Sequence, residues 1–146
     1  MIPGEPETSE LIARTRAIYA SLNSRDFDAV TAMFAPAGVW DVTSWGLGSK
    51  SGREAIRHFL TDWFGSLAEY EVRIEELHDL GAGVVLAVVL QVGRRTGSRG
   101  ELQVRSAPVF LWDQDGIAQV TLYRDLEAAR LAAQELAEAR ALAGYA

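Results

Sequence analysis

The segment from Val84 to Val92, VVLAVVLQV, is apolar at nearly every position. Such a run is typical of a β-strand that has protein on both faces, because a half-exposed strand alternates apolar and polar residues. Helices of the same chain can cover one face. The other face requires a second layer, and in a chain of 146 residues another copy of the sheet is the favoured source. We therefore expect a homodimer that forms through the sheet.

Further strands are predicted on both sides of this run. Residues 70–75, YEVRIE, alternate apolar and charged side chains, as a half-buried strand does. Leu102–Trp112 and Ile117–Tyr123 form the last two strands, and residues 113–116, DQDG, form the hairpin turn between them. A shorter first strand is predicted at Val39–Thr43. The sheet is therefore expected to be mainly antiparallel.

Two helices are predicted before the first strand. Apolar residues fall on one side of a helix that starts at Ser9 and is broken at Asn23. Asp26 is a natural N-cap for a second, short helix, which Pro36 and Gly38 are expected to close. The order of elements thus begins with helix, helix and strand.

Two more helices are predicted further along the chain. Ser51 and Glu54 have the spacing of a capping box, and an apolar stripe of period 3.6 follows them as far as Leu67. The Ala-rich segment Leu126–Leu142 has strong helix propensity. Its apolar stripe is weak, so the sequence does not indicate where this last helix docks.

Composition limits the class of protein. With 49% hydrophobic and 23% charged residues, the chain has the composition of one globular domain, which we place at residues 9–146 after a flexible leader at 1–8. The net charge of −6 disfavours nucleic acid, whose binding depends on Lys and Arg. No apolar window is long enough for a membrane span, and we expect a cytoplasmic protein. Without Cys or a His cluster, no metal and no cofactor are predicted.

Three segments carry a resemblance to a known family: SLNSRDFDAVTAMFAPAGVWD, SGREAIRHFL and DGIAQVTLYRDLEAA. In their order and spacing the chain resembles the SnoaL-like and ketosteroid isomerase-like branch of the nuclear transport factor 2-like superfamily. The resemblance implies an α+β cone, in which a strongly bent antiparallel sheet wraps around the N-terminal helices. The C-terminal helix is an addition to that pattern.

The resemblance also implies a conical cavity that aromatic side chains close. Tyr19, Phe59 and Trp63 are then wall candidates, Trp45 is a candidate for the mouth, and Trp40 is a further ligand-binding candidate on the first strand. A largely apolar pocket with a few polar groups is the general form of a small-molecule site. The alternative is that these aromatics only build the core.

Asp41 is the first candidate for catalysis. A carboxylate within an apolar strand would have its pKa raised by desolvation and could act as a base, and in ketosteroid isomerases the catalytic carboxylate lies on this strand. By that resemblance, however, the isomerase position falls at Val42. Since a shift of one residue turns a side chain to the opposite face, either a bulge corrects the register, or Asp41 faces away and Trp40 and Val42 line the cavity.

Asp125 is the second candidate. In SnoaL-like polyketide cyclases an aspartate at this point is the proposed acid or base, so the resemblance implies such a role here. The cyclase sites also use a His, and residues 105–110 contain none. Asp125 also stands directly before Leu126, where it is well placed to N-cap the last helix.

Arg105 and Tyr123 could assist either carboxylate. Arg105 alternates with apolar positions of its strand, as do Gln119 and Tyr123 on theirs. If these side chains line the cavity, they would donate hydrogen bonds to a carbonyl or an enolate oxygen. If they face solvent, they are ordinary surface residues.

Two functions follow. The chain is either a cofactor-free isomerase, cyclase or hydratase that acts on a small apolar carbonyl compound, or a non-catalytic module that binds a hydrophobic ligand or a second copy of itself. Fold analogy does not separate them. The two functions are distinguished by whether Asp41 or Asp125 lies in the cavity.

Overall fold

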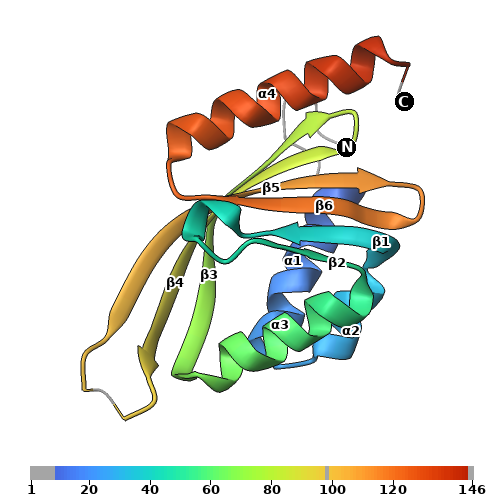
Figure 1. Ribbon diagram of the computed structural model, residues 1–146. Helices are drawn as coiled ribbons and strands as arrows, with labels where there is room; N and C mark the ends of the chain where they lie inside the picture. Colours follow the sequence, from blue (N-terminus) through green and yellow to red (C-terminus); the bar gives the residue numbers. More distant parts are fainter. Residues whose placement is uncertain (1–8, 98, 145–146) are drawn as a thin grey trace.

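The computed structural model describes residues 9–97 and 99–144 of this α+β chain (Figure 1). The predicted leader at 1–8 lies outside the described residues. In that described part, no helix is long and apolar enough to cross a membrane. The elements follow in the order α1 (Glu10–Asn23), α2 (Phe27–Ala32), β1 (Phe34–Asp41), the short 3-10 helix η1 (Thr43–Trp45), β2 (Ser49–Ser51), α3 (Arg53–Gly65), β3 (Leu67–Gly81), β4 (Val84–Arg95), β5 (Leu102–Asp113), β6 (Gly116–Tyr123) and α4 (Leu126–Leu142).

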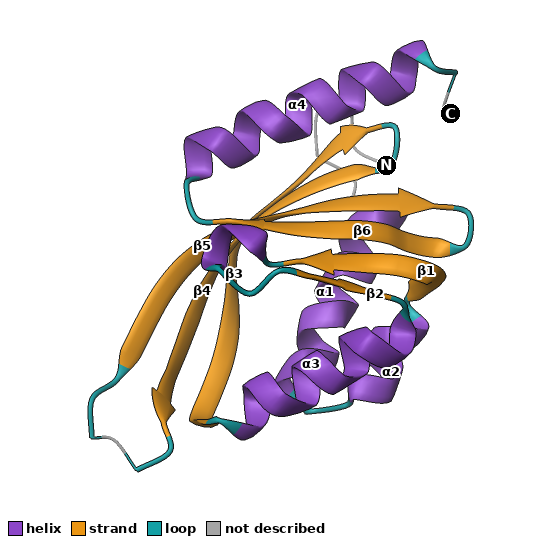
Figure 2. Cartoon of the chain, in the orientation of Figure 1, coloured by secondary structure: helices purple, strands orange, loops and turns teal. Residues whose placement is uncertain are grey.

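One bent sheet organises the molecule. Its strand order is β2-β1-β6-β5-β4-β3, and every neighbouring pair is antiparallel except β1 and β6, which run parallel. The long strand β3 changes register against β4 at three points, and such bulges bend a strand and increase its twist. Figure 2 shows the result: the sheet curls around α1, α2 and α3, while α4 crosses its outer side.

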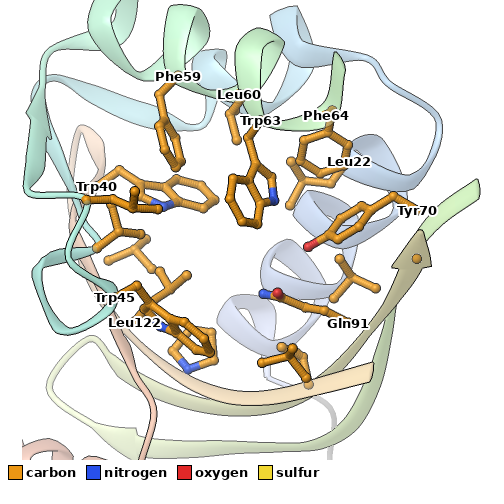
Figure 3. Close-up of a pocket in the computed structure, with 18 of the residues that line it drawn as sticks. Leu22, Trp40, Trp45, Phe59, Leu60, Trp63, Phe64, Tyr70, Gln91 and Leu122 are labelled. Atoms are coloured by element: carbon orange, nitrogen blue, oxygen red, sulfur yellow. The ribbon is translucent and has the colours of Figure 1, made fainter. Parts of the chain in front are cut away.

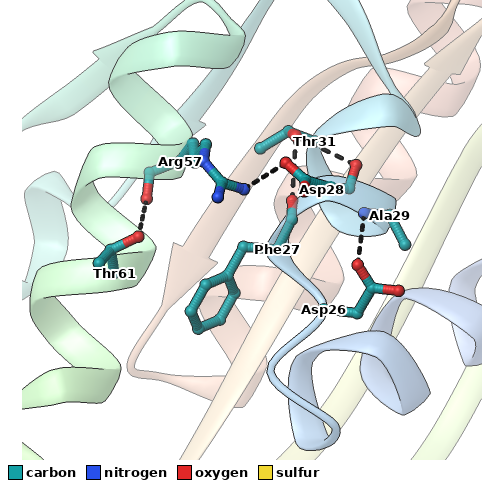
Figure 4. Close-up of polar contacts among 7 residues, drawn as sticks. All are labelled: Asp26, Phe27, Asp28, Ala29, Thr31, Arg57 and Thr61. Carbon is teal, nitrogen blue, oxygen red and sulfur yellow. Dashed lines mark hydrogen bonds and ion pairs between the residues drawn. The ribbon is translucent and has the colours of Figure 1, made fainter.

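The second helix is shorter than the sequence suggested. Asp26 caps it as predicted, since its Oδ1 accepts a hydrogen bond of 3.1 Å from the Ala29 N–H (Figure 4). The helix nevertheless ends at Ala32, and β1 starts at Phe34. Pro36 and Gly38 therefore lie inside a strand, at the point where the register of β1 against β6 shifts. The prediction failed because the bulged start of β1 places both residues that usually end a helix within a strand.

The predicted capping box is also wrong, although the helix that was predicted from it is present. Ser51 belongs to the short strand β2, which pairs with β1, and the N-cap of α3 is Gly52, without a side-chain cap bond. Gly52 has a φ of 88°, a left-handed conformation that glycine adopts without steric cost. The start of α3 is anchored instead by Arg53, whose guanidinium donates two hydrogen bonds, of 2.9 and 2.7 Å, to the Phe34 carbonyl.

An ion pair joins the helices α2 and α3, which pack against each other. Asp28 Oδ1 accepts a hydrogen bond from Arg57 Nη1 across a distance of 2.5 Å (Figure 4). Both side chains are exposed, so the pair contributes little to the free energy of unfolding. The pair lies between α2 and the helix that supplies one wall of the cavity.

The strand β4 separates two apolar cores. Val85, Ala87 and Val89 belong to the main core, with α1, α2 and α3. Val84 and Leu86 point to the other side, into a second core that α4 closes with Ala129, Ala133 and Ala137. Both faces of this part of β4 are thus covered within one chain. The reason given for a homodimer, an uncovered apolar face, is therefore wrong here: the missing layer is α4, whose docking the sequence left open.

Candidate functional site

A cavity of about 260 Å³ lies inside the curve of the sheet (Figure 3). The helices α1 and α3 close it from one side, and the loop after β1 contributes Trp45 and Leu47. Among the described residues the lining is largely aromatic and aliphatic: Tyr19, Leu22, Trp40, Val42, Trp45, Leu47, Phe59, Leu60, Trp63, Phe64, Tyr70, Val72, Val89, Gln91, Gly93, Leu102, Val104, Pro108, Val120 and Leu122. All five predicted ligand-binding residues are in this set.

Three aromatic rings form one continuous wall. Phe59 and Trp63 lie one turn apart on α3 and are stacked, with ring centroids 6.3 Å apart and an interplanar angle of 18°. Trp40 extends the row from β1, with its ring centroid 6.4 Å from that of Phe59. Offset ring pairs at such distances are favourable beyond their buried area. The wall therefore offers a ligand a broad, preformed apolar surface.

Two of the tryptophans present carbon to the cavity. The indole nitrogens of Trp40 and Trp45 are buried and have no hydrogen-bond partner among the described residues. Since these nitrogen atoms are covered by protein, what the two rings expose toward the cavity is their apolar surface. The polar groups that a ligand can meet must come from elsewhere in the lining.

Tyr70 supplies one of them. It lies on β3, and Figure 3 shows its hydroxyl pointing into the cavity. Burial raises the pKa of the Tyr70 hydroxyl to about 12, although a hydrogen bond from Trp63 and the nearby Arg25 charge both act in the opposite direction. Tyr70 is therefore a neutral hydroxyl at neutral pH. Its ring fits because Gly93 lies opposite: a Cβ atom on Gly93 would stand 3.0 Å from Tyr70 Cδ2.

Gln91 supplies the second polar group. It lies on β4, directly across from Val72 of β3, and its amide also points into the cavity (Figure 3). Its one hydrogen bond within the described part of the chain joins Nε2 to Ser106 Oγ at 3.5 Å, the outer limit for such a bond. Gln91 is not among the site residues predicted from the sequence. The available signal was that it is the one polar residue in the run Val84–Val92.

Tyr19 of α1 adds a third polar group, a second hydroxyl, to the lining. It is 6% exposed, and burial raises the pKa of its hydroxyl well above the ordinary tyrosine value, with a smaller contribution in the same direction from Tyr70. Like Tyr70, it stays protonated at neutral pH. A neutral hydroxyl can donate a hydrogen bond but is no base at that pH.

Asp41 does not line the cavity. Its carboxylate accepts a hydrogen bond of 2.9 Å from the Thr43 N–H, in the turn that leads into η1. Its neighbours Trp40 and Val42 are the residues that face inward. Of the two alternatives drawn from the strand register, the second is the one observed: no bulge brings Asp41 to the cavity side.

Asp125 and Tyr123 do not line it either. Asp125 is the N-cap of α4, and its Oδ1 accepts a hydrogen bond of 3.2 Å from the Glu127 N–H. Tyr123 packs under α4 against the second core, on the outer side of the sheet. Gln119 and Tyr123 share a cleft there with Ala132 and Leu136 of α4, so the polar face of β6 is turned away from the cavity.

Arg105 lies on the outer side as well. Its guanidinium forms two hydrogen bonds with the Glu75 carboxylate, of 2.5 and 2.9 Å. Both side chains are substantially exposed, and Arg105 pairs with Leu90 in the β4–β5 ladder, so the ion pair spans β4. The four predicted catalytic residues are therefore not brought together, and none of them reaches the cavity. The sequence left the orientation of Arg105 and Tyr123 open, because alternation along β5 and β6 does not reveal which face is the inner one.

Comparisons with known proteins agree with this geometry. The model of the SnoaL-like domain family matches residues 15–120, which is well over half of the chain. The chain belongs to the SnoaL-like domain family. A comparison with curated proteins finds no match.

Solved structures show that this SnoaL-like domain has the nuclear transport factor 2-like cone fold, as predicted. One is a protein with a ketosteroid isomerase-like fold from Catenulispora acidiphila in complex with trimethylamine, with 20% identity, a TM-score of 0.71, and coverage of 88% of this chain and 95% of that one. A putative SnoaL-like polyketide cyclase from Shewanella putrefaciens has 12% identity and a TM-score of 0.70, with 89% and 99% covered. The protein TerC, co-crystallised with polyporic acid, has 19% identity and a TM-score of 0.68, with 87% and 99% covered.

Proposed function

We propose that this SnoaL-like domain binds a small, mostly apolar molecule inside the cone, and that Asp41 and Asp125 perform no acid–base chemistry on it. One observation carries the proposal: within the described residues, the lining of the 260 Å³ cavity contains no Asp, Glu, His, Lys or Arg. A general acid or base must be within hydrogen-bond reach of its substrate. The two aspartates that the family resemblance favoured are engaged in a turn and a helix cap instead.

The cavity suits binding better than proton transfer. The titratable groups in its described lining are the hydroxyls of Tyr19 and Tyr70, and burial raises the pKa of both. They are hydrogen-bond donors at neutral pH rather than bases. An isomerase, cyclase or hydratase of the acid–base type would need a carboxylate or an imidazole at this position.

Two relatives of the same fold support a small-molecule role. The Catenulispora acidiphila protein was solved with trimethylamine, and TerC was co-crystallised with polyporic acid. A homodimer through the sheet stays a prediction, now without the support of an uncovered β4 face.

A pair of variants tests whether the cavity is the site. Val104 lines the cavity, whereas its neighbour Gln103 is exposed on the same strand. Val104→Trp fills the cavity, and Gln103→Trp places the same side chain outside it. Calorimetric titration with the hydrocarbon indane measures the binding. We expect Val104→Trp to weaken the affinity for indane about tenfold, which corresponds to the loss of about two buried methylene groups. Gln103→Trp should leave the affinity unchanged. Equal binding by both variants would refute the site.

A further inference from the structure

Tyr70 and Gln91 lie on adjacent strands and turn their polar atoms to the same space. β3 and β4 pair with Val72 opposite Gln91, and Tyr70 lies two residues before Val72 on the same face. Figure 3 shows the Tyr70 hydroxyl and the Gln91 amide on one side of the cavity, while Trp40 and Phe59 lie across from them. The cavity thus has a polar side and an aromatic side.

The hydroxyl of Tyr70 is available to a ligand. Trp63 acts on the pKa of this hydroxyl as a hydrogen-bond donor, and because an indole N–H can only donate, such a contact uses the tyrosine oxygen as its acceptor. The Tyr70 O–H therefore keeps its own proton to donate. The hydroxyl points into the cavity (Figure 3), so an acceptor atom of a ligand can accept a hydrogen bond from it.

Gln91 can bind the same atom or its neighbour. Its long contact with Ser106 Oγ uses one amide hydrogen, which leaves a second N–H and the carbonyl oxygen free within the described part of the chain. A carboxamide can donate to a ligand carbonyl or accept from a ligand hydroxyl. Together with Tyr70 it therefore recognises an oxygen without requiring a charge on it.

The surroundings of the cavity disfavour a cationic ligand. Several rings of the lining already have a protein cation against them: Arg25 lies 4.7 Å from the Phe64 ring centroid, Lys50 lies 5.4 Å from that of Phe59, and Arg124 lies 4.9 Å from that of Trp45. None of the three cations lines the cavity. An ammonium ligand would meet like charges, and within the described lining it would find no carboxylate.

We propose that the ligand is uncharged and carries one oxygen, a carbonyl or a hydroxyl, which binds between the Tyr70 hydroxyl and the Gln91 amide. Its apolar body then lies against the wall of Trp40, Phe59 and Trp63. This inference rests on the proposed function, to which it adds the polar group of the ligand and its orientation in the cone. Tyr70 and Gln91 are specificity-determining residues in this arrangement, whereas the aromatic wall provides affinity.

Three compounds with one skeleton test it by calorimetry: indane, indanone and aminoindane, which are a hydrocarbon, a neutral ketone and an ammonium at neutral pH. The variants are Tyr70→Phe and Gln91→Met, which keep the size of the side chain and remove its hydrogen bonds. The matched controls are Tyr123→Phe and Gln119→Met, because these side chains lie on the outer side of the sheet under α4. Circular dichroism verifies that each variant is folded.

For the native chain we expect indanone to bind about tenfold more tightly than indane, as one good buried hydrogen bond allows, and aminoindane more weakly than either. Tyr70→Phe and Gln91→Met should each reduce the indanone affinity several-fold and leave that of indane unchanged, whereas the two controls should change neither. Equal affinities for indane and indanone, or a preference for aminoindane, would overturn this inference while the proposed function stands. If none of the three compounds binds, both fail together.

Discussion

The side chain of Asn23 hydrogen-bonds to both main-chain groups of Val72. Asn23 Nδ2 donates to the Val72 carbonyl at 2.9 Å, and the Val72 N–H donates to Asn23 Oδ1 at 2.8 Å. β3 is an edge strand, so its outer main-chain groups have no neighbouring strand to pair with. Asn23 takes that place at the end of α1, and it thereby fixes α1 against the strand that carries Tyr70.

Asn23→Ala removes both bonds. We expect it to lower the free energy of unfolding by about 2 kcal/mol, since each bond contributes about 1 kcal/mol, as measured by urea denaturation. Asn23→Asp keeps the acceptor and loses the donor, and it should therefore be destabilised by an intermediate amount. A loss below about 0.5 kcal/mol in the alanine variant would show that water replaces the side chain at this edge.

Ionisation of Tyr70 predicts a loss of stability at high pH. The folded pKa of about 12 lies above the ordinary tyrosine value of about 10, so the folded chain keeps a proton that the unfolded chain releases. The resulting contribution of Tyr70 to the free energy of unfolding is fully present below a pH of about 10 and is lost as the pH rises toward 12. Thermal unfolding between pH 9 and 12 should show the decline. In Tyr70→Phe the free energy of unfolding should fall less between pH 9 and 12, by an amount on the order of 2 kcal/mol. The same fall in both proteins would contradict the prediction.

Asp125 is expected to matter for stability and not for binding. Asp125→Ala removes the N-cap of α4 and should lower the free energy of unfolding by about 1 kcal/mol. Asp125→Asn keeps a capping side chain and should stay close to the native value. Both variants should bind indane or indanone with unchanged affinity. A loss of binding in Asp125→Asn, with stability intact, would restore the carboxylate as a candidate in the chemistry.

The packing of α4 on the sheet depends on small side chains. Ala133 is fully buried against the second core, and Ala133→Leu should destabilise the chain by about 1 to 3 kcal/mol through overpacking. Ala128 is exposed on the same helix, so Ala128→Leu serves as the control and should be close to neutral. Denaturation of the two variants side by side checks this. Equal stabilities would mean that α4 is not tightly docked.

The sequence contained most of the fold. Period-2 alternation located β3, the unbroken apolar run located β4, and Leu126–Leu142 was predicted with the bounds that α4 has. The errors lie where local signals compete with tertiary pairing. Ser51 and Glu54 have the spacing of a capping box, but β2 pairs Ser51 with Val39 of β1, and this strand pairing prevails over the cap.

The candidate site was less predictable. Periodicity placed Phe59 and Trp63 on the apolar face of a helix, and the family resemblance implied that this face is a wall of the cavity. Periodicity does not report which face of a bent sheet is the inner one. Arg105 and Tyr123 were therefore candidates for the lining although they lie on the outer side, while Gln91, which lies in the cavity, was not predicted. Only long-range strand pairing separates them.

The strand β4 has a practical consequence for engineering. Its odd-numbered positions, such as Val89 and Gln91, border the cavity, while Val84 and Leu86 serve the layer beneath α4. Substitutions at alternate positions of one short segment therefore address two separate properties. Substitutions at the cavity-side positions can change which ligand the cavity binds. Substitutions at the positions beneath α4 can raise the thermal stability without changing the ligand specificity.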